Sequence, residues 1–203
     1  MSVVVKICGV RTVADARAAV DAGADLLGLN FAPASPRRLD VEAAVALAKA
    51  VPDVPLVGVF VDAGRAQVIQ IAAAVGLAGL QFHGDETPAD CRGFTQWTVK
   101  AIRARPGEDL AARAAEYDTD FILLDTFVPG AAGGTGVPLD PDAARGIPRA
   151  RLFLAGGLRP DTVAAAVRAV RPHGVDVASG VERSPGVKDH DKIQAFVRAA
   201  KAA

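Results

Sequence analysis

The chain has 203 residues, 51% of them apolar, and its 23 lysines and arginines balance 23 aspartates and glutamates. Zero net charge without a basic run excludes the electrostatic signature of most nucleic-acid-binding proteins and gives no support to acidic or membrane-surface partners. Cys8 and Cys91 form no disulfide-rich pattern, and no apolar stretch has the length of a signal peptide or of a membrane helix. We therefore expect a cytoplasmic protein without structural disulfides.

Eight short apolar runs recur along the chain. They are continuously apolar rather than alternating, which is typical of parallel strands buried on both faces. The predicted strands are residues 3–7, 26–30, 56–61, 80–83, 97–102, 121–125, 152–155 and 175–178.

Alanine-rich segments with helical spacing separate these strands. Thr12 precedes a helix predicted to stop at Gly23, and Asp40 precedes one that stops before Pro52. Residues 159–161 are predicted to open a helix that runs to Val170, with proline in its first turn. Residues 87–94 and 109–116 are the weakest helix candidates.

The repeated strand-helix order predicts one α/β domain that covers residues 1–203. Eight such units close into a single compact (β/α)8 TIM barrel, whereas six or seven could form an open doubly wound sheet. The count favours the barrel, and the first strand ends in Cys8-Gly9-Val10 without the glycines of a dinucleotide-binding turn. Because such barrels typically need about 250 residues, we expect short helices around strands four to six.

Polar residues at the carboxyl ends of the predicted strands are the candidates for chemistry, because barrels place their reacting groups there. Cys8 could be a thiolate base or nucleophile, or a small apolar filler. Lys6 shares a strand face with Cys8, so it would be buried and would need Asp125 or Asp176 as a partner. Its charge is expected to lower the pKa of Cys8.

Two further strand ends carry acid-base candidates. Asp125 closes an apolar run, where it could cap a loop or act as a general acid that apolar surroundings keep protonated near neutral pH. Asp176 is most simply a partner of Lys6. His83 could donate to a substrate or form a hydrogen bond across the barrel mouth, and His173 and His190 are expected on the surface.

Glycine pairs follow strands seven and eight. Gly156, Gly157, Ser179 and Gly180 could form plain turns, but together they favour a phosphate bound by backbone N–H groups. A third cluster, residues 133–136, is a candidate lid. No cluster of metal-ligand residues occurs at usable spacing, so we expect chemistry without a metal.

In order, these motifs resemble the phosphoribosylanthranilate isomerase family of tryptophan biosynthesis along nearly the whole chain. The matching segments are VKICG at 5–9, SPR at 35–37, VGVF at 57–60, LQFHG at 80–84, LDT at 124–126, GGTG at 133–136, LAGGL at 154–158, VDV at 175–177, SGVE at 179–182 and PGVKD at 185–189.

The resemblance implies an Amadori rearrangement of N-(5-phosphoribosyl)anthranilate to 1-(2-carboxyphenylamino)-1-deoxyribulose 5-phosphate without a cofactor. It assigns the general base to Cys8 and the general acid to Asp125. It also implies that Arg37 meets the anthranilate carboxylate and that Asp176 lies near the ribose. The partner would be this small phosphosugar, and the chain could be a monomer or a homodimer.

Three departures from the family pattern occur, all outside Cys8 and Asp125. Val10-Arg11 follows strand one, residues 139–141 read Leu-Asp-Pro, and Ala178 replaces the first serine of a Ser-Ser-Gly motif. The first two change the loop after strand one and the segment that follows the candidate lid.

Three other functions compete with this prediction. A histidine-pathway or dual-substrate isomerase would perform the same rearrangement, but that relative is expected to carry an aspartate in place of Cys8. A Schiff-base aldolase would use Lys100 in strand five. A non-catalytic phosphosugar-binding barrel would keep the glycines and lose the acid or the base.

Overall fold

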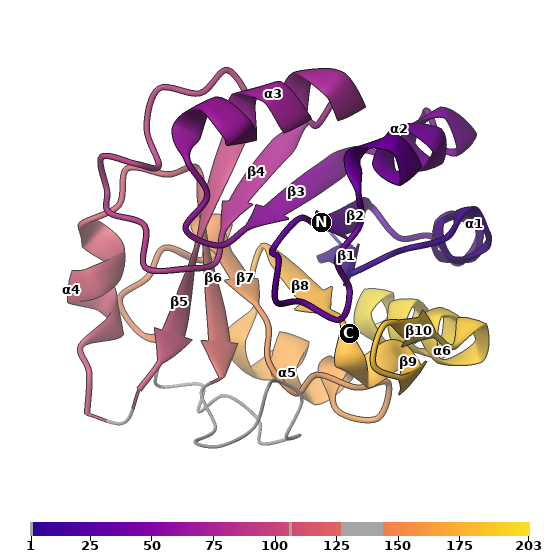
Figure 1. Ribbon diagram of the computed structural model, residues 1–203. Coiled ribbons are helices and arrows are strands. Elements are labelled where there is room, and N and C mark those ends of the chain that lie inside the picture. Colours follow the sequence, from indigo (N-terminus) through magenta and orange to yellow (C-terminus); the bar gives the residue numbers. More distant parts are fainter. Residues whose placement is uncertain (1, 106, 127–143) are drawn as a thin grey trace.

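A computed structural model of the protein describes residues 2–105, 107–126 and 144–203. Eight parallel strands pair in chain order, and the last pairs with the first, so they form a closed barrel surrounded by helices (Figure 1). The TIM barrel is confirmed, and the open-sheet alternative is wrong because β1 and β8 pair edge to edge. The strands are β1 (Val4–Cys8), β2 (Leu26–Asn30), β3 (Leu56–Phe60), β4 (Gly79–Phe82), β5 (Trp97–Ala104), β6 (Phe121–Thr126), β7 (Leu152–Leu154) and β8 (Gly174–Val177).

Helices connect most of the strands. Thr12 and Asp40 cap α1 and α2 as predicted, accepting hydrogen bonds from the backbone N–H groups of Asp15 and Ala43 at 3.1 and 2.7 Å. The helices are α1 (Val13–Asp21), α2 (Val41–Ala50), α3 (Arg65–Val75), α4 (Leu110–Ala115), α5 (Val163–Val170) and α6 (His190–Lys201). A small hairpin of β9 (Glu182–Ser184) and β10 (Val187–Lys188) lies between β8 and α6.

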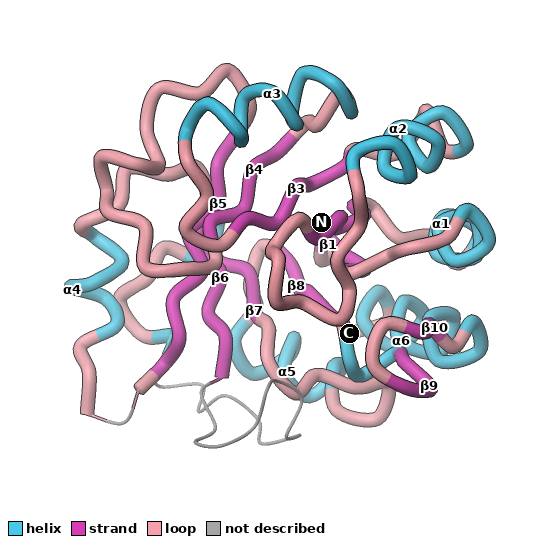
Figure 2. Tube along the Cα trace, viewed as in Figure 1, coloured by secondary structure: helices cyan, strands magenta, loops and turns pink. Residues whose placement is uncertain are grey.

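Two helix predictions need correction. No helix forms over residues 87–94, and the whole connection from β4 to β5 is loop and turn (Figure 2). There the Asp90 carboxylate accepts from both the backbone N–H and the hydroxyl of Thr87, and this local turn replaces helical hydrogen bonds. Helix α5 begins at Val163 rather than at 159, because Arg159 N–H donates to the Thr162 hydroxyl in a turn that precedes it.

Alternate residues of each strand face the barrel interior, which has two different ends. At the amino-terminal end four rings pack closely and close the barrel, and we call them the barrel floor. They are Trp97, Phe121, Phe153 and His173. Gly79 and Gly174 leave the space that Trp97 and Phe153 fill. His173 is therefore half-buried in the floor rather than on the surface.

The carboxyl-terminal end of the interior is polar. Lys6, Gln81 and Asp176 are buried there among apolar strand residues. Among the described helices, none has the length and hydrophobicity needed to cross a membrane.

Candidate active site

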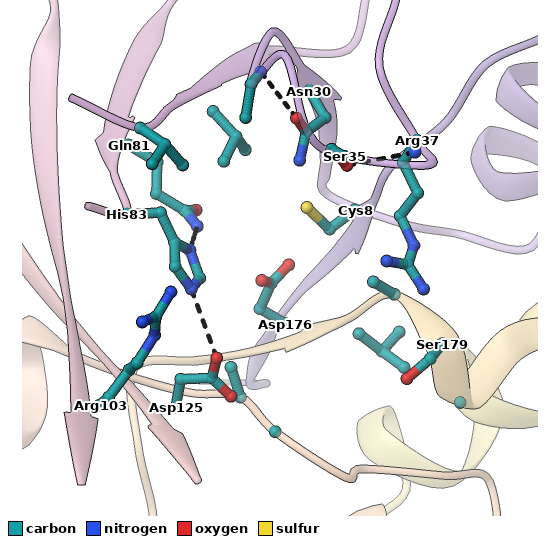
Figure 3. Close-up of a pocket in the computed structure, with 18 of the residues that line it drawn as sticks. Cys8, Asn30, Ser35, Arg37, Gln81, His83, Arg103, Asp125, Asp176 and Ser179 are labelled. Atoms are coloured by element: carbon teal, nitrogen blue, oxygen red, sulfur yellow. Dashed lines mark hydrogen bonds and ion pairs between the residues drawn. The ribbon is translucent and has the colours of Figure 1, made fainter. Parts of the chain in front are cut away.

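A cavity of about 500 Å³ opens at the carboxyl-terminal end of the barrel. Every site residue predicted from the sequence lines it: Cys8, Arg37, His83, Asp125, Gly156, Gly157, Asp176, Ser179 and Gly180. The strand-end rule, with Arg37 added by the family resemblance, therefore selected residues that the closed barrel brings together from six separate parts of the chain. Figure 3 shows Cys8 and Asp176 in the middle of this cavity, with His83 and Asp125 on one side and Arg37 and Ser179 on the other.

Cys8, Lys6 and Asp176 form a buried group inside the barrel. Strand register pairs Lys6 with Asp176, and Lys6 Nζ donates to Asp176 Oδ1 at 2.9 Å. A Cβ at Gly28 would lie 2.8 Å from Cys8 Sγ and 3.0 Å from Lys6 Nζ, so only a glycine on β2 leaves room for both groups. The predicted pairing of Lys6 with Asp176 is confirmed.

The expected lowering of the Cys8 pKa by Lys6 is outweighed by burial and by Asp176. Burial raises the pKa of the Cys8 thiol above its ordinary value, and the Asp176 carboxylate raises it further. Lys6 and Lys188 lower the Cys8 pKa, but by less, so the prediction of a lowered pKa is wrong. Burial opposes the charge on Lys6 as well, yet Asp176 and Cys8 together raise the pKa of Lys6.

His83 and Asp125 meet on the opposite wall. His83 Nε2 lies 3.3 Å from Asp125 Oδ2, and the other ring nitrogen, Nδ1, lies 2.9 Å from the side-chain nitrogen of Gln81. The expected contact of His83 across the mouth is thus present, and its partner is the predicted acid.

The surroundings of Asp125 are more polar than its sequence neighbours suggested. Its side chain is 26% exposed, and strand register places Arg103 beside it on β5. Both residues line the cavity. The apolar setting expected for Asp125 is therefore absent, and His83 supplies its hydrogen-bonding partner instead.

Arg37 is held by a second buried cluster. Its Nε and Nη2 atoms donate to the two carboxylate oxygens of Glu182 at 2.7 and 2.8 Å, and Lys188 Nζ donates to the same carboxylate at 3.0 Å. Burial opposes the charge on Glu182, but Arg37 and Lys188 bring the pKa of Glu182 below its usual range. Gly9, with a φ of 72°, passes so close to the Arg37 side chain that a Cβ would collide with it.

The glycine pairs shape the cavity wall after β7 and β8. Gly156 and Gly157 have φ values of 77° and 64°, which glycine adopts without strain. A Cβ at Gly180 would collide with the carbonyl oxygen of Leu158. Lys192 from α6 lines the adjoining pocket together with Gly157 and Gly180, so backbone and a cation meet where an anion is expected.

Some predictions fall outside the described residues, namely the candidate lid at 133–136 and the departure at 139–141. Among the residues that are described, no group of three His, Cys, Asp or Glu side chains could hold a metal ion.

Comparisons with known proteins identify the family of this chain. A family model for N-(5'phosphoribosyl)anthranilate (PRA) isomerase matches residues 5–199. An N-(5'-phosphoribosyl)anthranilate isomerase from Thiobacillus denitrificans is 50% identical over 204 residues, with 100% of each chain covered. This chain belongs to the N-(5'-phosphoribosyl)anthranilate isomerase family.

Solved structures of the same family have the same fold as this chain. The phosphoribosyl anthranilate isomerase of Thermotoga maritima has a TM-score of 0.90 and 37% identity, over 99% of this chain and 100% of that one. A phosphoribosyl anthranilate isomerase in complex with reduced 1-(o-carboxyphenylamino)-1-deoxyribulose 5-phosphate has a TM-score of 0.86 and 37% identity, with the same coverage. The resemblance stated from the sequence is confirmed.

Membership of this isomerase family also bears on the competing functions. Lys100, the candidate Schiff-base lysine, lies outside the cavity: its Nζ donates to Glu86 at 2.7 Å and to the carbonyl oxygen of Gly84 at 2.7 Å. Lys100 therefore cannot reach a substrate in the cavity as the nucleophile of a Schiff-base aldolase. A non-catalytic barrel is disfavoured because the family is one of isomerases and both Cys8 and Asp125 line the cavity.

Sequence reasoning missed the residues that support the site from behind. Gln81, Glu182 and Lys188 lie in matched motifs but were given no role, and Arg103 was not singled out at all. Gln81 carried a usable signal, because a polar residue inside an apolar strand run needs a partner. The pairing of Glu182 with Arg37 carried none, since 145 residues separate them.

Proposed function

We propose that this chain catalyses the rearrangement of N-(5'-phosphoribosyl)anthranilate to 1-(2-carboxyphenylamino)-1-deoxyribulose 5-phosphate in tryptophan biosynthesis, with Cys8 as general base and Asp125 as general acid. The observation that carries the proposal is that Cys8 and Asp125 line one cavity in a chain of this isomerase family. A related structure that holds a reduced form of the product supports the substrate class.

The substrate has a charged group for each end of the cavity. Gly156, Gly157, Ser179 and Gly180 would bind the phosphate through backbone N–H groups, and the Ser179 hydroxyl can add a hydrogen bond. Arg37 would meet the anthranilate carboxylate with the guanidinium edge that Glu182 leaves open. A planar fork of donors suits a carboxylate.

The first step opens the sugar ring. Protonated Asp125 gives its proton to the furanose oxygen, the bond from that oxygen to C1 breaks, and the nitrogen lone pair forms a C=N bond. The product of this step is an open-chain iminium with a free hydroxyl. His83, 3.3 Å from Asp125, can donate a hydrogen bond to the carboxylate that remains.

The second step moves a proton from carbon. The Cys8 thiolate removes the proton from C2, the electron pair forms the C1=C2 bond, and the iminium nitrogen recovers its lone pair. The Cys8 thiol then returns a proton to C1 of the enolamine, and the C2 hydroxyl loses its proton to the Asp125 carboxylate as it becomes the ketone, so both residues return to their starting states. Burial and Asp176 raise the pKa of Cys8, so its thiolate is a strong base, and the positive iminium that forms beside it stabilises the charge of the thiolate.

Because the iminium is itself an electron sink, the proposed reaction uses no metal or other cofactor. We place it in the cytoplasm, in line with the two buried free cysteines of the described chain. Whether the protein acts as a monomer or a homodimer stays a prediction.

The test is a fluorescence assay on freshly prepared phosphoribosylanthranilate, with Cys8→Ala as the paired variant. We expect the anthranilate signal to fall when wild-type protein is added and to stay constant with the variant. A folded wild-type protein that leaves the signal constant would contradict the proposed reaction.

A further inference from the structure

Among the described residues, Gln81 is the one buried polar residue of the cavity wall to which neither the sequence nor the proposed reaction assigns a task. We propose that Gln81 is a positioning residue: it fixes the proton of His83 on Nε2, so that His83 donates a hydrogen bond to Asp125 whenever Asp125 is ionised. This inference rests on the proposed function and adds a residue that acts on the proposed acid, Asp125, through His83.

The position of Gln81 in the barrel makes a purely structural role a poor explanation. Strand register places it between Val59 on β3 and Val99 on β5, and its side chain is almost completely buried. Burying an amide among apolar side chains costs free energy unless hydrogen bonds compensate. Among the described residues its Oε1 atom has no hydrogen-bond partner at all.

Within the described part of the chain, the one polar contact of the Gln81 side chain is with the His83 ring. Its Nε2 lies 2.9 Å from Nδ1 of His83, two residues further along β4 (Figure 3). A glutamine that only tied strands together would form hydrogen bonds through both its amide nitrogen and its amide oxygen. Here only the amide nitrogen has a partner, and that partner is the His83 ring.

This contact determines which nitrogen of the ring carries the proton. An amide nitrogen can only donate, so Nδ1 must accept, and in the neutral ring the proton is then on Nε2. Nε2 is the atom that faces Asp125 Oδ2, at 3.3 Å. The direction of donation is therefore Gln81 to His83 to Asp125.

The chain of donors matters most in the ring-opening step. When Asp125 gives its proton to the sugar oxygen, a negative charge appears on the carboxylate, and a hydrogen bond to a charged acceptor is stronger than one to a neutral acid. The support from Gln81 and His83 therefore grows as the reaction proceeds, which lowers the barrier without tightening substrate binding. Among the described residues, the other charged or titratable groups that line this cavity are Arg103 from β5, Cys8 from β1, Asp176 from β8 and Arg37 from the loop after β2.

The first experiment measures the ring directly, in the protein without substrate. Nitrogen-15 NMR of histidine-labelled protein separates the protonated from the unprotonated ring nitrogen, and a His83→Asn variant assigns the signals among the three histidines. We expect neutral His83 to carry its proton on Nε2, and we expect the Nδ1 signal to move downfield in Gln81→Met, where Nδ1 loses its donor. A proton on Nδ1 in the wild type, as the amide rotated by 180° would require, overturns the proposal, and so does an unchanged Nδ1 signal in the variant.

The second experiment measures turnover. Gln81→Met keeps the length of the side chain and removes both heteroatoms, and we expect kcat to fall roughly tenfold while KM stays within about twofold. In a His83→Asn background the same substitution should have no further effect on kcat. Gln81→Leu serves if Gln81→Met does not fold. A rise in KM at constant kcat, an unchanged kcat, or an additive effect in the double variant would each overturn the role.

Thr98→Val is the matched control. Thr98 is a buried polar residue on the neighbouring strand β5, and it contacts Asp120 rather than the cavity. We expect neither the His83 signals nor kcat to change. Because the NMR measurement needs no turnover, it decides the tautomer even if the proposed reaction is wrong.

Discussion

The protein contains the same three residue types, a cysteine, a lysine and a carboxylate, in two buried groups. We call them the inner group and the outer group. The inner group, Cys8, Lys6 and Asp176, faces the barrel cavity, and the outer group, Cys91, Lys100 and Glu86, lies outside the barrel wall. The lysine and carboxylate are 2.9 Å apart in the inner group and 2.7 Å apart in the outer one. Composition, burial and ion-pair geometry therefore do not tell the two groups apart.

The remaining hydrogen bonds of the two groups distinguish them. In the outer group Lys100 also donates to the Gly84 carbonyl oxygen, and the Glu86 carboxylate accepts from the backbone N–H groups of Asp62 and Gly84. These bonds tie the loops after β3 and β4 to β5. In the inner group, within the described residues, Asp176 accepts only from Lys6, and its carboxylate borders the cavity.

The pKa values of the two thiols do not distinguish the groups either. Burial raises the pKa of Cys8 and raises that of Cys91 to about 11. A perturbed thiol pKa is therefore no sign of function in this protein. What separates Cys8 from Cys91 is the open space in front of it, and four predictions test that separation.

The largest expected difference is between the two cysteines. Cys8→Ala removes the proposed base and should lower kcat by roughly 10²- to 10⁴-fold, while the affinity for a product analogue is kept. Asp125→Asn should act similarly. Cys91→Ala is the matched control and should leave kcat unchanged, because Cys91 does not border the cavity. Equal losses from the two alanine variants in the fluorescence assay would remove the distinction.

The second prediction concerns the stability of the outer group. Lys100→Met leaves Glu86 buried without its cation, which should cost about 3–5 kcal/mol of unfolding free energy in a urea titration. The kcat of the folded fraction should not change. A Lys100→Met protein that is as stable as wild type but inactive would place Lys100 in the reaction after all.

Arg37 provides the third prediction, because it combines an ion pair with a place in the cavity. Arg37→Ala should raise KM roughly tenfold and lower kcat less, since Arg37 is proposed to hold a part of the substrate that does not react. Glu182→Gln should change KM in the same direction by a smaller factor, because the guanidinium then loses its charged support. Loss of kcat at an unchanged KM would contradict this role for Arg37.

The smallest effects are expected on the ionisation of Cys8, which the rate of alkylation reports as a function of pH, with mass spectrometry to identify the site. Lys6 lowers the Cys8 pKa and Asp176 raises it. Lys6→Met should therefore move the midpoint to higher pH, and Asp176→Asn should move it to lower pH. Neither change should affect Cys91, and shifts of the same sign in both variants would contradict the proposed balance of charges.

The sequence predicted the barrel because its strands are continuous apolar runs, and the closing pair, β8 with β1, followed from the count. It also placed Cys8, Asp125, Asp176 and the glycine pairs at strand ends, where barrels expose them. These inferences need only the order of residues along one strand.

Contacts between strands were harder to predict. Lys6 could be matched to Asp176 because both lie in apolar runs, but the choice between Asp176 and Asp125 depends on register, which the structure supplies. The Cys8 pKa was predicted in the wrong direction because only the nearest charge was considered, and burial outweighs it. The missing helix at 87–94 reflects the turn that Thr87 and Asp90 form locally.

The barrel floor has a practical consequence. Trp97 is the one tryptophan of the chain, and it packs edge-on against Phe121 at the amino-terminal end of the barrel. Tryptophan emission depends on the polarity around the indole, so the emission wavelength of Trp97, which is partly buried, reports whether the rings of the floor stay packed. Because Trp97 does not border the cavity, this signal follows the integrity of the barrel in each variant separately from events at the opposite end. The fluorescence of Trp97 is thus an intrinsic probe of folding, at the end of the barrel where no substrate is proposed to bind.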